Sequence, residues 1–505
     1  MGRALRLLPW LVPIGMLAAW QVVPAGLYSE LSTAMIPVLI ALGALLVASR
    51  RPVACLVALF ALMPYQVFFP AWLYKIGVPL GIIRPLTGWR ELAGLAIMLA
   101  AIRTSRRERR PLDTVELVAF AYVALVSAYV LFPRLFAAAA PEETDVRSQA
   151  FRASAGFVLL LIACRRAPYG SRARDLADKA LRWTAVVVAM LAVWEFIDGD
   201  GWNTVVVDTL QVTRYQVEVL QSRPYDFNDV RVYSEIGGVQ VVRVSSVMGS
   251  PLALGHFLLI PFGLALERSL RGRTKGATAQ AVLIGAAILF TQTRSALLGS
   301  AVVLMLVLRR SPGRTEAARG RFWLLLVGLS VAAAPFVISA GLFDRFSDEG
   351  SNTAHREGFF EGVGVVAGDP LGRGLGTSAG VGQRFFTATS VSENYYLQVG
   401  AEAGVLGTVL FVGLVVSVNR GLRRVRDETG DGVVAGVRSG FFGVCVAAFF
   451  LHAFNNQTVA WTAFGAAGMA LGAIARARDP DRPIGATIDP EQTYPHIDQG
   501  SPSHT

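Results

Sequence analysis

The sequence predicts an all-α integral membrane protein, a transmembrane helical bundle of about 14 spans. The chain of 505 residues is 53% hydrophobic and only 16% charged, whereas soluble domains carry about 25% charged residues. Its apolar residues form long uncharged blocks, such as 281–290 and 301–308, without the period of an amphipathic helix or strand. Blocks of about 20 apolar residues have the length that a helix needs to cross the hydrocarbon layer.

Each predicted span is an apolar block bounded by polar or basic residues. The ranges are 8–26, 32–48, 53–73, 86–102, 112–132, 150–164, 181–198, 251–267, 276–292, 295–309, 322–341, 396–417, 436–453 and 456–475. The fourth is the weakest, because it is short and contains Arg90 and Glu91, so a tilted or partly interfacial helix is expected there. The first block is long enough to span and no small-residue cleavage site follows it, so no cleavable signal peptide is expected.

Short clusters of basic residues separate the spans and predict the orientation of the chain. When the N-terminus is placed in the cytoplasm, every cluster falls on the cytoplasmic side, including 103–110, 165–182 and 420–426. The C-terminus is then also cytoplasmic, and the expected location is the inner (plasma) membrane. The net charge of +11 therefore reflects membrane topology, and no nucleic-acid partner is expected.

Two long segments, 199–250 and 342–395, fall on the outer side, where loops of this length usually serve a function. The first mixes β-branched and charged residues, as in 209–220, and a short hairpin is expected in this loop. The second contains an amphipathic stretch, 353–367, expected to lie on the membrane surface as a helix. The predicted parts are N-terminal helices (1–198), a first outer loop (199–250), central helices (251–341), a second outer loop (342–395), C-terminal helices (396–475) and a disordered cytoplasmic tail (476–505).

The residues that often mark metal or nucleotide sites form no such pattern in this sequence. Cys55, Cys164 and Cys445 fall within or at the ends of apolar stretches, which is typical of apolar packing residues rather than of a disulfide framework or a metal site. The sequence contains no HExxH, paired CxxC, Walker loop or nucleophile elbow. Neither a metal nor another cofactor is therefore expected.

Two arginines lie at predicted outer boundaries of spans. Arg243, in VVRVSSVMGSPLALGHF, closes the first outer loop just before a span that Pro251 opens. Arg294, in LFTQTRSALLGS, lies in a tight outer turn between two apolar blocks, against the cytoplasmic bias of basic residues. A guanidinium group suits phosphate, and an arginine in such a turn is costly unless something binds it. Snorkelling to lipid headgroups is the alternative for Arg243.

The second outer loop contains His355, Arg356 and the stretch GDPLGRGLGTSAG, which includes Arg373. The three named side chains are candidate substrate-binding residues. The glycines resemble a dinucleotide fingerprint only superficially, because no βαβ unit surrounds them. Their backbone N–H groups could approach a phosphate, and a flexible turn is the alternative.

The segment SVSENYYLQVGAEAGVLGTVLF opens the next span. Glu393 is a candidate general base, since a carboxyl group beside an apolar helix can have a raised pKa. Asn394 and Tyr395 are candidate substrate-binding residues, although tyrosines at this depth, including Tyr396, commonly anchor a span at the interface. Glu402 lies deeper in the span and is expected to be a packed or hydrogen-bonded acid, with a functional role as the alternative.

Weaker signals are expected to have structural roles. Asp198, Asp200 and Asn203 mimic the start of a calcium loop, but the remaining ligands and their spacing are absent. His256 and His452 lie in or near predicted spans, where histidines are more often packed or hydrogen-bonded than bound to a metal.

Taken together, four segments resemble a known family. The first is an Arg–Ser–Ser–x–x–Gly–x–Pro span start, in which one valine stands between the arginine and the first serine. The second is a TxTRSA junction, the third is an arginine with a DPLGxGxG loop, and the fourth is ENYYLQxxAExGxxG, which opens a span. This series is similar to the bacterial O-antigen ligase and O-antigen polymerase superfamily of membrane glycosyltransferases. The likeness covers about residues 240–415, and the first half of the chain matches only in hydropathy.

The resemblance implies a C-type glycosyltransferase fold and a polyprenyl-diphosphate-linked oligosaccharide as donor on the outer face, without nucleotide sugar or metal. It implies that Arg243 and Arg294 hold the diphosphate and that Arg356 supports the same charge. Glu393, before Asn394, stands where the ligases commonly show histidine, which favours a polymerase of O-antigen, capsule or exopolysaccharide.

Several alternatives to a polymerase remain. The acceptor could be a lipid-linked glycan, lipid A core, a protein hydroxyl or a cell-wall polymer, and an O-antigen ligase is the first alternative function. Membrane lipids, and with them flippase and chain-length regulator proteins, are the other expected partners. A transporter or flippase of a lipid-linked glycan is the second alternative, which a path of charges through the membrane midplane would favour.

Overall fold

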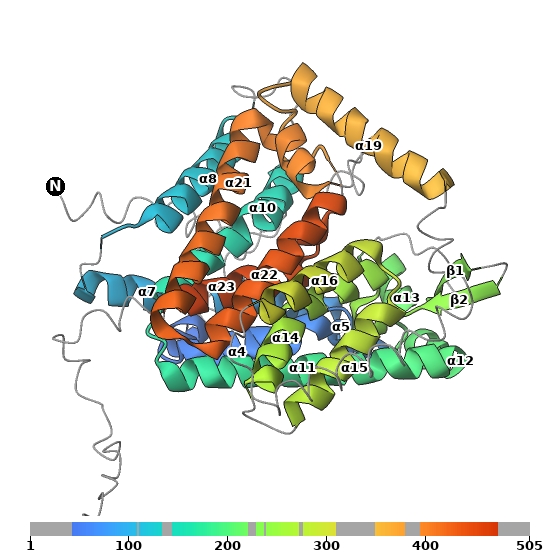
Figure 1. Cartoon of the computed structure of the whole chain (residues 1–505). Coiled ribbons are helices and arrows are strands. Elements are labelled where there is room, and N and C mark those ends of the chain that lie inside the picture. Colours follow the sequence, from blue (N-terminus) through green and yellow to red (C-terminus); the bar gives the residue numbers. More distant parts are fainter. Residues whose placement is uncertain are drawn as a thin grey trace, which may run out of the picture.

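The computed structural model is a helical bundle with a small two-stranded sheet at one end (Figure 1). It describes residues 43–108, 111–133, 144–220, 229–236, 239–271, 276–309, 349–378 and 394–472. The predicted spans 8–26 and 322–341 and the predicted cytoplasmic tail lie outside these residues. The predicted membrane-protein class is confirmed, because the described chain consists mainly of long apolar helices.

Helices account for nearly all of the regular structure. They are α4 (Pro52–Leu62), α5 (Phe68–Lys75), α6 (Leu80–Thr87), α7 (Trp89–Glu108), α8 (Thr114–Leu131), α10 (Thr144–Arg166), α11 (Ser171–Ile197), α12 (Gly199–Thr204), α13 (Val212–Glu218), α14 (Pro251–Leu270), α15 (Gly276–Phe290), α16 (Arg294–Leu308), α19 (Glu349–Gly368), α21 (Tyr395–Thr429), α22 (Gly432–Phe450) and α23 (Gln457–Gly472). Strands β1 (Val232–Ile236) and β2 (Val239–Arg243) pair antiparallel. Short helical turns are η2 (Met63–Tyr65), η3 (Val205–Thr209), η4 (Ser246–Met248) and η5 (Ala453–Asn455).

Six helices of the described chain are long and apolar enough to cross a membrane: α8, α10, α11, α14, α21 and α22. The pair α4–η2 and α5, bent by 68°, would add a seventh span if it counts as one, and α15 and α16 are shorter apolar helices. Among the described residues from 53 onward, each predicted span therefore forms a helix or a bent helix pair. The count of about 14 spans and their orientation stay predictions.

The centre of the bundle is the contact between α14 and α22, which glycines make unusually close. A Cβ atom on Gly440 would lie 2.6 Å from the Cα atom of Ile260, and one on Gly436 would lie 2.8 Å from the Cα atom of Leu264. The two glycines are four residues apart and therefore share one face of α22. Small residues at this spacing let membrane helices approach until their backbones touch.

Buried ion pairs join the helix ends that carry the predicted cytoplasmic clusters. Arg166 on α10 donates to both oxygens of Glu116 on α8 at 2.7 and 2.6 Å, and both side chains are at most 5% exposed. Arg268 on α14 contacts Asp178 on α11 at 2.6 Å. Because a buried charge is costly unless it is paired, these contacts hold the neighbouring helices together at this end.

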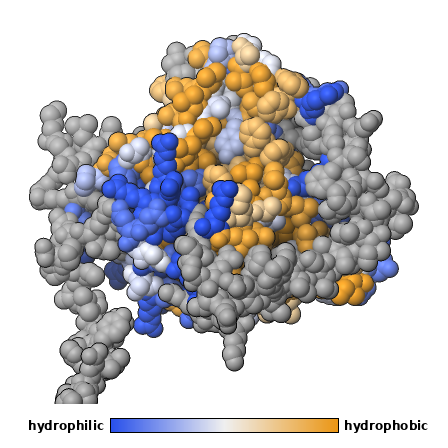
Figure 2. Space-filling model, viewed as in Figure 1, coloured by the Kyte–Doolittle hydropathy of each residue, from blue (hydrophilic) through white to orange (hydrophobic). Residues whose placement is uncertain are grey.

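The outer surface of α8 and α21 is apolar, as expected where a helix meets lipid. Val405, Leu406 and Val409 of α21 are about half exposed, as is Leu117 of α8. Figure 2 shows apolar residues over the middle and upper part of this face, with hydrophilic residues gathered at its left. This distribution fits an apolar belt with a polar end.

The first outer loop contains the expected short hairpin. Strands β1 and β2 form this hairpin, which confirms the prediction for the loop, whereas the segment 209–220 folds largely as helix α13. Val212 and Tyr215 of α13 are buried on one face, so packing overrides the strand preference of the β-branched residues. In the second outer loop, the stretch 353–367 forms part of α19, which confirms the predicted helix.

The residues that mimic a calcium loop hold this outer region together. Asp198 caps α12 by accepting from the Gly201 N–H at 2.9 Å, and Asn203 accepts from a backbone N–H of the segment before β1. Asp200 pairs with Arg231, whose hydrogen bond also lowers the pKa of Asp229. The three cysteines are free, and Cys164 and Cys445 are buried, as expected of packing residues.

Candidate functional site

A polar cavity of about 410 Å³ opens among the helix ends. Its volume lies within the range of about 300–1,000 Å³ that is usual for ligand sites. Six segments supply its walls: the turn after η2, the junction from the end of α6 to the start of α7, the first half of α10, the end of α13, the start of α21, and the chain from η5 into α23. In the predicted topology all six segments lie on the outer side, so the cavity faces outward if that topology holds.

One wall of the cavity carries two arginines that share one buried carboxylate. Arg90 on α7 donates from Nε to Glu91 at 2.9 Å and also donates to the side chain of Gln66. Arg152 on α10 lies 3.5 Å from the same oxygen of Glu91. The Glu91 side chain is fully buried, and its second oxygen has no hydrogen-bond partner within the described ranges. Mutual pairing explains how these charges are tolerated in an apolar bundle.

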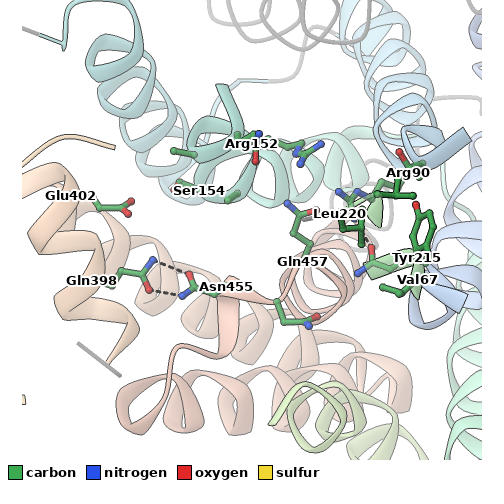
Figure 3. Close-up of a pocket in the computed structure, with 17 residues that line it drawn as sticks. Val67, Arg90, Arg152, Ser154, Tyr215, Leu220, Gln398, Glu402, Asn455 and Gln457 are labelled. Atoms are coloured by element: carbon green, nitrogen blue, oxygen red, sulfur yellow. Dashed lines mark hydrogen bonds between the residues drawn. The ribbon is translucent and has the colours of Figure 1, made fainter. Parts of the chain in front are cut away.

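The other side of the cavity is formed by Glu402, Gln398 and Asn455. The two amides exchange hydrogen bonds of 2.9 and 2.7 Å, which join α21 to η5. Figure 3 shows this pair and Glu402 on one side, Arg90 and Tyr215 on the other, and Arg152 from a further helix. The Glu402 carboxylate is buried and accepts the Ser378 N–H at 3.2 Å. Glu402 is thus both hydrogen-bonded, as expected, and part of the cavity.

Helix α21 is broken beside Glu402, and the glycine-rich segment of the second outer loop covers the break. Gly404 has a φ of 70°, which interrupts the helical hydrogen bonds. The N–H groups of Arg373 and Gly374 donate to carbonyls of Ala401 and Glu402 at 2.7 and 3.0 Å, and Val405 donates to the carbonyl of Pro370 at 2.9 Å. Irregular backbone at membrane depth needs such partners. Two backbone N–H groups of this segment therefore brace the helix.

Arg243 and the TQTR turn before Arg294 lie together in a second cluster. Arg243 donates to the carbonyl of Thr291 at 3.3 Å and to the hydroxyl of Thr293 at 3.4 Å. Gln292, which has a φ of 51°, donates to the carbonyl of Val242 at 3.3 Å. The β2 strand is therefore bonded to the turn that begins α16, and the two predicted arginines belong to one local structure.

A buried glutamate on α11 holds the turn that follows Arg243. Glu195 is 0% exposed and accepts the N–H groups of Ser245, at 2.8 Å, and Ser246, as well as the Ser245 hydroxyl at 3.1 Å. Ser246 has a φ of 47°, an uncommon conformation for a residue with a side chain. Such strained positions persist only where the surroundings hold them, and they cluster at functional sites.

The remaining predicted residues lie elsewhere. Arg356 is exposed on α19, and Arg373 pairs with Asp369 at 2.7 Å. Neither arginine lines the cavity. Asn394 caps α21 by accepting from the N–H groups of the second and third helical residues at 2.9 and 3.2 Å. Tyr395 is buried, with its ring centroid 5.2 Å from that of Phe411. It is therefore a core residue instead of an interface anchor.

Two predicted site residues cannot be placed by their side chains. Glu393 lies outside the described residues, and only the backbone of His355 is described, as part of α19.

The two histidines that were expected to have structural roles, His256 and His452, differ in environment. The ring of His256 is buried and lies 2.8 Å from the hydroxyl of Ser295, the residue after Arg294, and His452 directly precedes η5.

Reasoning from the sequence missed Arg152, Glu195, Gln398 and the amides around η5 as site residues. One signal was available: Arg90 and Glu91 interrupt the weakest predicted span, and ionisable residues inside spans usually have a function. The amides gave no such signal, because isolated Asn and Gln at helix ends also act as caps.

No protein-family model matches the chain, and no curated protein matches it significantly. The resemblance to the O-antigen ligase and polymerase superfamily therefore rests on the four sequence segments described above.

Proposed function

We propose that this protein is a membrane glycosyltransferase that transfers a polyprenyl-diphosphate-linked oligosaccharide to a second glycan on the outer face of the membrane. The observation that carries the proposal is the cavity, whose six wall segments all belong to the predicted outer side and whose lining combines arginines, a carboxylate and amides. A polar cavity at one end of an apolar bundle suits a substrate with a lipid tail and a polar head.

The reaction needs no external energy source, because the donor already carries an activated leaving group. The acceptor hydroxyl oxygen attacks the anomeric carbon of the donor sugar, and the bond from that carbon to the diphosphate oxygen breaks. The electron pair leaves with the lipid diphosphate, and a carboxylate takes the hydroxyl proton. Guanidinium groups placed at the diphosphate stabilise the charge that develops there.

The roles follow from the two clusters. Arg243 and Arg294 are the proposed diphosphate ligands, and their shared local structure supports a joint role. Glu393 is the proposed base on the sequence resemblance. Glu402 is a second candidate, because it is the acidic side chain that lines the cavity among the described residues.

The proposal is tested by deleting the gene in its host and separating surface and lipid-linked glycans on a gel. Complementation with wild type should restore the ladder of long chains, and Arg294→Ala should not, although the protein still inserts. Arg309→Ala is the matched control, because it removes an arginine from the opposite end of α16. Loss of the ladder with single repeat units retained identifies a polymerase.

Other outcomes of the same experiment separate the alternatives. Long chains that stay on the lipid carrier without reaching their acceptor identify a ligase. An unchanged ladder in the deletion strain contradicts both and favours a transporter. Normal chain extension by Arg294→Ala removes the diphosphate role of this residue. Glu393→Gln and Glu402→Gln, compared in the same strain, show which carboxylate the reaction requires.

A further inference from the structure

Side-chain amides dominate the polar lining of the cavity. Among the described residues, Gln66, Gln149, Gln398 and the run Asn455–Gln457 contribute six amides, against two guanidinium groups and one carboxylate. An amide group both donates and accepts hydrogen bonds. Buried polar groups of this kind are costly without partners, so this concentration of amides indicates a ligand with many hydroxyl groups.

The paired amides of Gln398 and Asn455 can still form hydrogen bonds to such a ligand. In the exchange between Gln398 and Asn455, each amide uses one N–H and accepts once through its oxygen. Each therefore retains a second N–H and a second lone pair. The pairing also fixes the orientation of both groups, so that little side-chain entropy is lost when a ligand binds.

Gln457 gives the strongest indication that a ligand with hydroxyl groups binds in the cavity. Its Oε1 atom is buried and has no hydrogen-bond partner in the part of the chain that the structure describes, and the residue lines the cavity. A buried acceptor that is left unpaired destabilises a protein. A hydroxyl group of a bound ligand would satisfy it.

We propose that the cavity is the acceptor subsite of the transferase and binds the terminal sugar of the receiving glycan through Gln398, Asn455 and Gln457. This inference rests on the proposed function. Neighbouring hydroxyl groups on a sugar ring each donate and accept, which matches the amides, and Tyr215 adds an aromatic wall. Glu402 lies in the same cavity, where it can receive the proton of the acceptor hydroxyl.

The donor diphosphate is the competing occupant, and the charges disfavour it. The cavity contains the acid Glu402 on the side of the amide pair, and a carboxylate repels a dianion at short range. Arg90 is already bonded to Glu91 and Gln66. The cluster of Arg243 and the TQTR turn lies outside the lining and leaves the diphosphate a separate site.

The test measures binding to the full-length protein in lipid nanodiscs. The probe is the oligosaccharide that mild acid releases from the lipid-linked intermediates of the host, titrated by calorimetry. Wild type should bind it saturably, and Gln457→Leu should bind about tenfold more weakly, the effect of about one hydrogen bond. Its thermal unfolding temperature should not fall, because no protein partner of Oε1 is lost. A Gln398→Leu, Asn455→Leu double variant should bind more weakly still.

Asn419→Leu is the matched control, because Asn419 is an amide of α21 that bonds to the Val415 carbonyl outside the cavity. It should bind the oligosaccharide like wild type. Displacement of the oligosaccharide by sodium pyrophosphate, or wild-type affinity in Gln457→Leu, would overturn the inference. Arg294→Ala should bind normally yet fail in transfer. Normal transfer by that variant would contradict the diphosphate role alone, whereas absence of binding by active wild type would contradict the acceptor subsite alone.

Discussion

Gly372 of the second outer loop lies against Gly404 of α21 so closely that a Cβ atom on Gly372 would come within 2.5 Å of the Gly404 nitrogen. Both glycines have left-handed φ angles, 81° and 70°. The contact places the loop over the broken helix beside Glu402. The glycine-rich motif therefore joins the second outer loop to the helix that lines the cavity.

Gly372→Ala should destabilise the protein, because the added Cβ would also lie 2.7 Å from the Glu402 carbonyl oxygen. We expect a loss of about 2 kcal/mol or more from the clash and the strained φ together. Thermal unfolding in detergent, followed by size-exclusion chromatography, measures it. Gly364→Ala on α19 is the control, because nothing lies within 4 Å of its added Cβ. Equal stability of the two variants would contradict the bracing role of the loop.

Glu195→Leu should reduce transfer at least tenfold while the protein still inserts. One carboxylate oxygen of Glu195 accepts the N–H groups of both Ser245 and Ser246, and leucine offers them no acceptor, so the turn after Arg243 would shift. A displacement of about 1 Å can cost 100-fold in rate. Glu267→Leu, which replaces a buried acid at the end of α14 away from this turn, should keep its activity. Unchanged chain extension by Glu195→Leu would show that this turn has no part in the reaction.

The Arg166–Glu116 pair should matter for stability far more than any exposed pair. Removing one partner, as in Arg166→Met, leaves the buried Glu116 carboxylate with the more distant Arg165, at 3.7 Å, and should cost about 3 kcal/mol. The double variant Arg166→Met, Glu116→Gln should recover part of that loss. Arg424–Glu428 on α21, with exposures of 71% and 33%, should contribute less than about 1 kcal/mol. A double-mutant cycle for each pair by thermal unfolding compares them.

Gly440→Ala should weaken the contact between α14 and α22. The new methyl group would press on the backbone of Ile260, and overpacking of this kind costs about 1–3 kcal/mol. Gly413→Ala should be nearly neutral, since its added Cβ would meet only a Val118 methyl at 3.7 Å. Unfolding temperatures of the two variants in nanodiscs measure this difference. An unchanged unfolding temperature for Gly440→Ala would mean that α14 and α22 can move apart without loss of stability.

Much of the membrane architecture can be predicted from hydropathy alone. The predicted blocks 112–132, 181–198 and 251–267 each overlap a long helix of the structure within a few residues, except that α11 begins ten residues early. This works because a spanning segment must be helical and apolar whatever it packs against. The short hairpin predicted for the first outer loop is present, whereas the helical fold of 209–220 depends on what its apolar residues pack against.

The candidate site was predictable in part. Arg243 and Arg294 stand out because charges at outer span ends are rare, and the structure joins the strand that ends at Arg243 to the turn that begins at Arg294. The amides of the cavity could not be found in this way. Gln398 and Asn455 are 57 residues apart, and nothing in either local sequence indicates that they pair.

The sequence by itself determined the membrane class, the positions of most described helices and the charged residues that a bilayer makes conspicuous. These properties follow from the cost of placing polar groups in hydrocarbon, which each segment bears on its own. Only the tertiary structure decided that Arg90, Arg152, Glu402 and the amide pair share one cavity and that the glycine-rich loop closes over a broken helix. Those relationships depend on packing between segments far apart in the chain, which local composition does not encode.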